Sequence, residues 1–542
     1  MKGYMKKTLG CTLSGLIALT VILSGCSKDE PSSSASGKTG EAGKSKPSIT
    51  VSMYDRGNIP QEIGTVDNNL WTKWVNENSG VNVKFIPVPR SDSVKKFNTL
   101  LAAGQAPDLI LEYDTNFLNQ LYTQKQIMPL DDLIDQYSTE YKQLLEQYPL
   151  LRKLGTKSDG KLYGIGRVLG YIPGNFLFIR QDWLDKLGLK VPETDEEAFE
   201  VMKAFASQDP DGNGKADTFG ANLSGAGGGW VDTMFQNVSW IINDGNLVRD
   251  WERAEDAASY KKRMFEEGLV DKDYLTDNVG KKSEQDFLQG KTGIYGAAGS
   301  VHLIYTQYQT FKSNNPDAKL TVIAVPRSKY GQFSPGFNAP IQMSGAVNAK
   351  AASPEGVIQL IDFLSSASTV KTMKYGLEGV HYKMEDGKEV TLDKDKYDKE
   401  ISWLGDFRMV GSQYLINEFT KYLEDLDQSK PLDKDVYDMM TKAYSLYISK
   451  DHPIPAITMD GYMPGLPADM LFIANNVNQP VTDLWNKAIV SGKGYTVEQA
   501  AADAKSLWKK SDGEKLEKWY ADWYAANKDS WVFTKDLYDM KF

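Results

Sequence analysis

One short segment has the spacing of a calcium-binding loop. The segment DPDGNGKADTFG, residues 209–220, follows an EF-hand loop at its early positions, where calcium takes side-chain and carbonyl oxygens around a glycine. The oxygens would come from Asp209, Asp211, Asn213, the Lys215 carbonyl and Asp217. Gly220 stands where an EF-hand has a bidentate glutamate, so we expect a structural calcium ion and no opening switch. An Asx-rich turn without metal is the alternative.

Aromatic side chains form a second set of candidates. The chain has 12 Trp and 28 Tyr, and a pyranose ring can stack on the flat face of such residues. Those in expected loops near Gly or Pro are the candidates for a ligand site: Tyr54, Tyr171, Trp230, Trp240 and Trp403. For each of them, burial in a hydrophobic core is the alternative.

Polar residues near the same expected loops are candidate partners for ligand hydroxyl groups. They are Asp55, Glu112, Asp114, Arg167, Asn175 and Asn338. Arg167 is distinct, because a guanidinium matches the two oxygens of a carboxylate and would suit a uronate. An ordinary surface arginine is the alternative for Arg167.

Several classes of function lack their sequence signals. The formal net charge of −10 argues against a nucleic-acid partner, since phosphate backbones need clustered cations. The sequence GKTGIYG, residues 290–296, lacks the first glycine of a phosphate-binding loop. His302, His381 and His452 are far apart in the sequence and have no zinc-site spacing. No motif indicates an enzyme, although 72 acidic residues leave a pair of catalytic carboxylates possible.

The N-terminus has the pattern of an export signal. Three lysines precede an apolar run over residues 9–23, which is too short for a membrane-spanning helix. The run ends in Leu-Ser-Gly before Cys26, and this resembles the lipobox of bacterial lipoproteins, in which the cysteine receives the lipid. We therefore expect a signal peptide at 1–25, and lipidated Cys26 with a flexible Ser/Gly-rich tether at 26–47. An ordinary signal peptide with an incidental cysteine is the alternative.

The first part of the mature chain alternates between strand and helix patterns. Strands are expected at 48–55, 81–89 and 107–114, and helices at 68–80 and 94–101. This order predicts a parallel, doubly wound sheet. Ligands of such sheets gather at the carboxyl ends of the strands, which here are 54–56, 87–90 and 112–114.

A second block of elements follows, and the whole chain is too long for one core. A strand at 175–180 runs into a helix at 182–189, and a further helix at 194–207 has Thr194 and Glu197 as its capping box. A strand is expected at 320–326, a helix at 353–366 and a mostly helical, Trp-rich part after about residue 401. With 542 residues, at least two lobes are expected.

Six segments in series resemble a known family. They are LLAAGQAPDLI, GKLYGIG, NFLFIRQDWLDKLGL, FEEGLVDKDYL, DFLQGKTGIYG and KYGLEGVHYKM. Together with the lipobox they resemble the carbohydrate-type extracellular solute-binding proteins of ABC importers, and within them the LipO or LplA type lipoproteins related to alginate-oligosaccharide-binding proteins. The resemblance implies an α/β fold of the periplasmic-binding-protein type II, similar to maltose-binding protein, with two lobes of doubly wound sheets flanked by helices and joined by a hinge.

The resemblance also implies lobe boundaries and a further metal ligand. Lobe 1 would hold residues 48–168 and 322–395, and lobe 2 would hold 169–321 and 396–542. The alginate-binding relatives have an acidic residue where this chain has Thr218, so the Thr218 hydroxyl, a water or a remote acid would complete the calcium site.

The function that the resemblance implies is the binding of a solute without a chemical reaction. The protein would bind an oligosaccharide, with uronate-containing oligosaccharides among the candidates, and deliver it to the permease subunits of an ABC transporter. It would be a monomer held by its lipid on the outer face of the cell membrane, in a Gram-positive bacterium. Two alternatives stay open: the same fold binding a peptide or another small polar solute, and a cell-surface glycosidase or lyase.

Overall fold

A computed structural model describes residues 46–277 and 279–542. The expected signal peptide at 1–25, Cys26 and the tether up to residue 45 lie outside the described residues. Within the described ranges, no helix has the length and apolar character needed to cross a membrane.

The first sheet has five strands in the order β2-β1-β3-β11-β4. The strands are β1 (Ser48–Asp55), β2 (Asn82–Pro89), β3 (Leu109–Leu111), β4 (Gly164–Val168) and β11 (Ile341–Val347). β1 pairs in parallel with β2 and β3, as the strand and helix alternation predicts. β11 runs antiparallel to β3 and β4, so the sheet is mixed and not wholly parallel. The carboxyl ends of β1, β2, β3 and β4 therefore lie at the same edge.

Helices cover the first sheet because their apolar stripes need a partner surface. Asn69 begins the first helix, accepting hydrogen bonds from the backbone N–H groups of Trp71 and Thr72. The elements around this sheet are α1 (Leu70–Asn78), α2 (Ser93–Ala102), α3 (Thr115–Thr123), α4 (Asp131–Tyr137), α5 (Glu140–Gln147), α6 (Pro149–Gly155), α13 (Pro354–Ser365), α14 (Ala367–Tyr375), the hairpin of β12 (Tyr382–Glu385) and β13 (Lys388–Thr391), and α15 (Lys394–Glu400).

The second sheet has four strands in the order β10-β5-β9-β6. The strands are β5 (Asn175–Arg180), β6 (Phe219–Ala221), β9 (Thr292–Ala298) and β10 (Leu320–Val322). The capping box of Thr194 and Glu197 is present at the start of α8. The other elements of this part are α7 (Gln181–Leu187), α8 (Asp195–Ser207), α9 (Trp230–Met234), α10 (Glu252–Glu266), α11 (Lys281–Leu288), α12 (Val301–Asn314), α16 (Glu418–Asp425) and α17 (Pro431–Tyr447), with the hairpin of β7 (Trp240–Asn243) and β8 (Asn246–Arg249).

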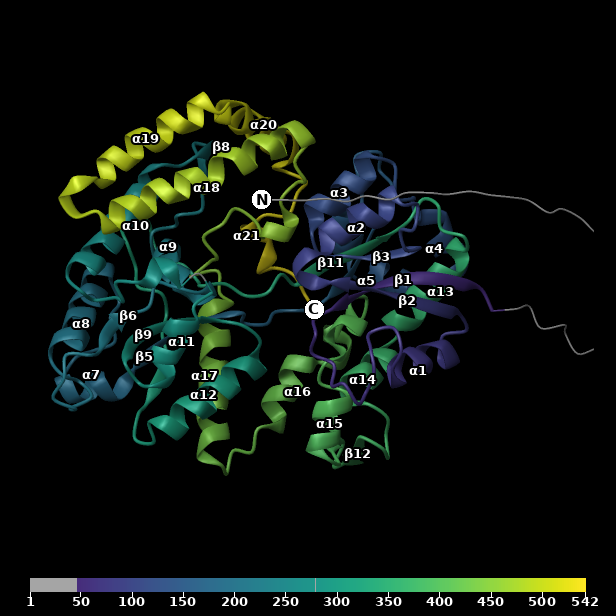
Figure 1. Ribbon diagram of the computed structural model, residues 1–542, viewed down its shortest axis with the longest axis horizontal. Helices are drawn as coiled ribbons and strands as arrows, with labels where there is room; N and C mark the ends of the chain where they lie inside the picture. The colour runs from purple at the N-terminus through teal and green to yellow at the C-terminus, as the bar shows by residue number, and fades with distance from the viewer. Residues whose placement is uncertain (1–45, 278) are drawn as a thin grey trace, which may run out of the picture. The chain divides into compact units, whose positions relative to one another are not determined.

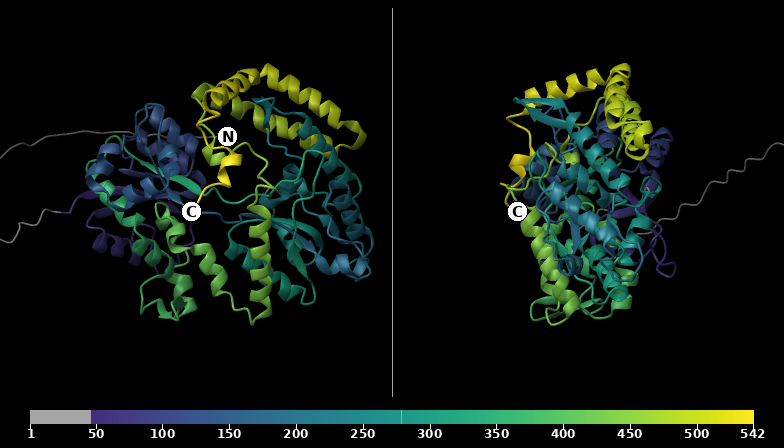
Figure 2. Two further views of the ribbon diagram at one scale, coloured as in Figure 1. Left: turned by 180° about the vertical axis from the view of Figure 1, so that it is seen from behind. Right: turned by 90° about the vertical axis from the view of Figure 1, so that its left-hand side faces the viewer.

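The C-terminal helices lie along the second part of the molecule, drawn in yellow in Figures 1 and 2. They are α18 (Ala468–Val490), α19 (Val497–Lys510) and α20 (Gly513–Asn527); the short α21 (Thr534–Leu537) follows them, and its Leu537 is buried in the core of the first sheet. α18 packs on α10, and α20 packs on β8. Trp508, Tyr520 and Phe533 are buried in the hydrophobic cluster that these helices form, as expected for a Trp-rich helical end of the chain.

Two segments pack on the other sheet than the one to which the expected lobe boundaries assign them. Residues 401–410 were expected in lobe 2, but Ile401, Leu404 and Phe407 are buried in the core of the first sheet. Val325 was expected in lobe 1, but it is buried in a core of the second sheet. Both differences arise because apolar side chains in connecting segments pack on the nearer sheet, which the family resemblance does not specify.

Candidate ligand-binding site

The carboxyl edge of the first sheet brings Tyr54 and Glu112 together. The Tyr54 hydroxyl donates a hydrogen bond of 2.6 Å to Oε1 of Glu112, and the backbone N–H groups of Tyr113 and Asp114 donate to the same oxygen at 2.7 and 2.9 Å. The Glu112 side chain is buried, and its Oε2 has no hydrogen-bond partner among the described residues. A buried carboxylate oxygen without a donor is costly, so this position suits a ligand hydroxyl.

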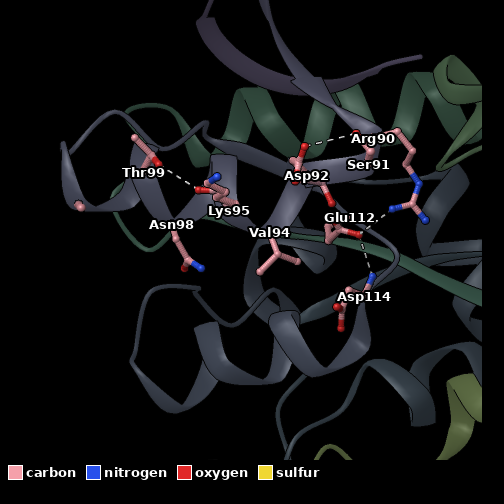
Figure 3. A pocket seen from close by; sticks show the side chains of 11 residues that line it. Arg90, Ser91, Asp92, Val94, Lys95, Asn98, Thr99, Glu112 and Asp114 are labelled. Carbon is pink, nitrogen blue, oxygen red and sulfur yellow. Dashed lines mark hydrogen bonds and ion pairs between the residues drawn. The ribbon is translucent and has the colours of Figure 1, made fainter. Parts of the chain in front are cut away.

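Arg90 lies beside this pair, at the end of β2. Its guanidinium is 4.7 Å from the centroid of the Tyr54 ring, and its Nη1 is 3.9 Å from Oε1 of Glu112. Burial and the hydrogen bond to Glu112 raise the pKa of Tyr54, so its hydroxyl stays a neutral donor. Figure 3 shows Arg90, Glu112 and Asp114 around a cavity of about 940 Å³. We call Tyr54, Arg90, Glu112 and Tyr113 the edge cluster.

Two further arginines near the edge cluster are already held by protein groups. Arg56 donates to both carboxylate oxygens of Asp406, at 2.6 and 3.0 Å. Arg167 is buried, and it donates through Nε and Nη2 to Oε1 of Gln342 and through Nη1 to the carbonyl of Arg408. The surface-arginine alternative for Arg167 is therefore wrong. The guanidinium of Arg167 is also engaged, which leaves Arg90 as the one of these three arginines whose guanidinium makes no hydrogen bond within the described residues.

A second cavity, of about 570 Å³, is lined by residues of the first sheet and by residues of helices that lie beside the second sheet. Arg167 and Gln342 line it from the first sheet, and Val301 and Phe419 line it from α12 and α16. Glu418, at the start of α16, lies 2.7 Å from Arg408 and 3.0 Å from Lys374. Burial opposes its ionisation, but these two cations lower the pKa of Glu418 to about 2. The wall thus carries an ionised carboxylate that is paired with two cations of the same wall.

Four of the five predicted aromatic residues are not in the edge cluster. Trp230 is 3% exposed and lies in a core of the second sheet, and Trp403 is 8% exposed in the core of the first. Trp240 packs 4.5 Å from Tyr520, and the Tyr171 hydroxyl donates to the carbonyls of Leu537 and Met540. Trp230 and Trp403 are thus buried in hydrophobic cores, which is the alternative stated for them, whereas Tyr171 and Trp240 are half-buried and pack against such cores.

Of the predicted polar residues, Glu112 belongs to the edge cluster and the others lie outside it. Asp55 is exposed at the end of β1 and accepts a hydrogen bond from Gly57 N–H. Asp114 accepts from the Phe117 N–H as the cap of α3. Asn175 begins β5, and the exposed Asn338 lines the second cavity. Sequence reasoning missed Arg56, Arg90 and Tyr113, although all three lie in the strand ends at which ligands were expected.

The calcium-type loop is closed by its own hydrogen bonds. The N–H groups of Asn213 and Gly214 donate to the Asp209 carboxylate, and the Asn213 side-chain amide donates to Asp211 and Asp217 at 2.7 and 3.1 Å. The Asn213 side-chain amide thus holds two carboxylates and the backbone N–H groups hold the third, and these oxygens form a ligand set that fits calcium. Burial and the neighbouring Asp209 and Asp217 carboxylates raise the pKa of Asp211, and a cation would relieve this repulsion.

The Thr218 hydroxyl already has a protein partner in this structure. It donates to the Phe205 carbonyl at 2.8 Å, and the residue is buried beneath the loop. Within residues 46–277 and 279–542, no three His, Cys, Asp or Glu side chains are arranged as a metal-binding group. The residues that would hold calcium are therefore Asp209, Asp211, Asn213, Asp217 and the Lys215 carbonyl.

Comparison with known proteins identifies the family. A family model described as bacterial extracellular solute-binding protein matches residues 60–371, which is more than half of the chain. Lipoprotein LipO of Bacillus subtilis is 26% identical, over 92% of this chain and 95% of its own length. The polygalacturonan/rhamnogalacturonan-binding protein YtcQ of the same organism is 28% identical, over 74% of this chain and 80% of its own length.

Solved structures have the same fold at lower sequence identity. An extracellular solute-binding protein of Bifidobacterium longum subsp. infantis has a TM-score of 0.70 at 19% identity, covering 89% of this chain and 98% of its own. The alginate-binding protein AlgQ2, solved without calcium ion, has a TM-score of 0.64 at 19% identity, covering 92% and 99%. The two sheets, their mixed topology and these matches confirm the predicted type II fold. The chain belongs to the bacterial extracellular solute-binding protein family.

Proposed function

We propose that this protein captures an oligosaccharide at the edge cluster and delivers it to the permease of an ABC transporter. The observation that carries the proposal is the buried Oε2 of Glu112, without a hydrogen-bond partner among the described residues, beside the tyrosines and Arg90. The names of relatives support a sugar: YtcQ binds polygalacturonan and rhamnogalacturonan, and FusA of Streptococcus pneumoniae, 28% identical over 38% of this chain, is the substrate-binding protein of a fructooligosaccharide transporter.

Each member of the edge cluster has a role in this proposal. Oε2 of Glu112 accepts a hydrogen bond from a sugar hydroxyl, while Tyr54 holds Oε1 in place. The half-buried Tyr113 offers its ring to the apolar face of a sugar. Arg90 pairs with the carboxylate of a uronate, the role first expected of Arg167. Asp55, Asp114, Asn175 and Asn338 supply further hydrogen bonds at the rim.

Binding is coupled to closure of the two lobes. A ligand that contacts both lobes stabilises the closed arrangement over the open one, by as much as its affinities for the two states differ. The closed protein then presents one combined surface to the permease. No covalent step is needed, and we propose that the protein is a monomer and not an enzyme.

The protein is held at the outer face of the cell membrane of a Gram-positive bacterium by a lipid on Cys26. The lipobox-type sequence before Cys26 supports this, and one relative is named as a lipoprotein. Calcium in the 209–217 loop stabilises the second lobe and takes no part in binding. A solved structure of FusA is named as an EF-hand mutant, which supports a loop of this kind in a related fold.

The proposal is tested by a thermal-shift screen of the mature protein against plant and bacterial oligosaccharides, uronates included. A ligand that binds only the folded state raises the midpoint of unfolding. The Glu112→Gln variant should lose this rise for the same ligand, while Glu146→Gln, an exposed glutamate on α5, should keep it. A panel in which peptides raise the midpoint and no sugar does would favour the alternative solute, and release of new reducing ends would indicate an enzyme.

A further inference from the structure

A cavity of about 520 Å³ lies away from the edge cluster, between the first sheet and the C-terminal helices. Leu118 and Asn119 of α3, the end of α6, and Gly164 and Gly345 of the sheet line one side. The other side is formed by the loop from Gly461 to Gly465, by α20 and by the segment after it. Its volume is within the range of about 300–1,000 Å³ that small-molecule sites occupy. None of the residues assigned to the edge cluster lines it.

Two lysines line this cavity, and each faces an aromatic ring instead of a carboxylate. Nζ of Lys153 is 5.8 Å from the centroid of the Trp531 ring, and Nζ of Lys157 is 6.0 Å from that of Tyr122. Within the described ranges, neither ammonium group makes an ion pair or a hydrogen bond. Elsewhere in the same residues, lysines at comparable depth are paired, as Lys261 is with Asp232 at 2.6 Å.

The charges around the two ammonium groups are unbalanced. Burial lowers the pKa of both lysines. Asp536 opposes this shift at Lys153 only, and its carboxylate is already engaged by the Phe533 N–H at 2.9 Å. An anion bound in this cavity would offset the two positive charges, whose burial without a partner is unfavourable.

The aromatic wall of the cavity is rigid. Nε1 of Trp531 donates to the Tyr462 carbonyl at 2.8 Å, and Trp523 packs against the Trp531 ring edge-on at 5.9 Å. Gly465 leaves room for the Asn119 amide, because a Cβ at this position would lie 2.6 Å from Asn119 Cγ. The cavity thus offers two cations, a fixed indole and an amide.

We infer that this cavity is a second binding site, for a sugar acid whose carboxylate lies between Lys153 and Lys157 and whose ring packs on Trp531. Two ammonium groups select a carboxylate, and an indole with an amide selects a hydroxylated ring over a bare anion. The inference does not depend on what the edge cluster binds.

The test is a titration of the mature protein labelled with 5-fluorotryptophan, followed by fluorine NMR. Trp531→Phe identifies the Trp531 signal among the 12 tryptophans. Galacturonate should shift this signal, whereas galactose, its neutral counterpart, and inorganic phosphate should not at the same concentration. Lys153→Gln with Lys157→Gln should raise the dissociation constant by at least about tenfold. The exposed Lys161→Gln is the matched control and should change nothing.

Each other outcome overturns the inference. No shift with galacturonate would exclude the site, and an equal shift with galactose would exclude recognition of the carboxylate. A shift with phosphate as large as that with galacturonate would mean that the cavity binds anions in general and does not select a sugar acid. Arg90→Gln should leave the Trp531 response intact, so failure here and failure of the edge cluster to bind sugar are separate results. Melting curves of the lysine variants check that they are folded.

Discussion

The aromatic residues at the carboxyl edge of the first sheet have a different environment from those in the core of the second sheet. At the edge, Tyr54 is held by Glu112 and lies beside a half-buried tyrosine and an arginine. In the second core, Trp230 is closed in by apolar side chains, and its Nε1 donates to the Asn222 carbonyl. The difference comes from topology: parallel strands end at one edge and bring their next residues together, whereas a loop beside glycines has no such constraint.

The largest effect should come from Trp230→Ala. Removing a fully packed indole leaves a cavity, so we expect a loss of about 3–5 kcal/mol in the free energy of unfolding. Sugar affinity of the protein that remains folded should not change. Denaturant unfolding gives the free energy, and Phe472→Ala, at an exposed residue of α18, is the control, with a change within about 0.5 kcal/mol. A lost affinity with unchanged stability would place Trp230 in the binding site.

The next effect is a dependence of the free energy of unfolding on pH, and it is caused by Glu418. Its pKa is lowered to about 2, so its ionised form stabilises the folded protein above its unfolded pKa. This contribution, at most about 3 kcal/mol, is lost as the pH falls from about 4.5 to 2. Unfolding measured across that range should show a shallower loss for Glu418→Gln than for the wild type. Parallel curves for the two proteins would contradict the ion pairs with Arg408 and Lys374.

A smaller effect, on binding alone, is expected for Arg90→Gln. The variant should bind a uronate oligosaccharide about tenfold more weakly, because one charge-assisted contact is lost. A neutral oligosaccharide of the same length should bind nearly as before. Calorimetry with both ligands makes the comparison, and Lys84→Gln, at an exposed residue of β2, is the matched change of charge. An equal loss of affinity for both sugars would mean that Arg90 does not pair with the carboxylate.

The smallest effect should follow removal of calcium. Chelation should lower the midpoint of thermal unfolding by a few degrees, about what 1 kcal/mol gives in a large domain. Asp217→Asn should remove the difference between melting curves in calcium and in chelator, and Thr218→Val should keep it. Identical wild-type curves in the two conditions would favour the Asx-rich turn.

The strand and helix patterns were sufficient for β1, β2 and β3 of the first sheet, because hydrophobic alternation and turn residues specify parallel units locally. They could not show that β11 runs antiparallel between β3 and β4, since its partners are far away in sequence. The same limit applies to the site. Tyr54 lies near the end of β1 and Glu112 directly follows β3, so both could be predicted as candidates, but the pairing of Arg167 with Gln342 and Arg408 depends on long-range packing.

The central claim is that the edge cluster binds the oligosaccharide, and a crystal structure with the best ligand of the thermal-shift screen tests it most directly. The account predicts a sugar hydroxyl within hydrogen-bond distance of Glu112 Oε2 and a sugar ring against Tyr113. An oligosaccharide bound elsewhere, with Glu112 Oε2 still without a partner, would contradict it.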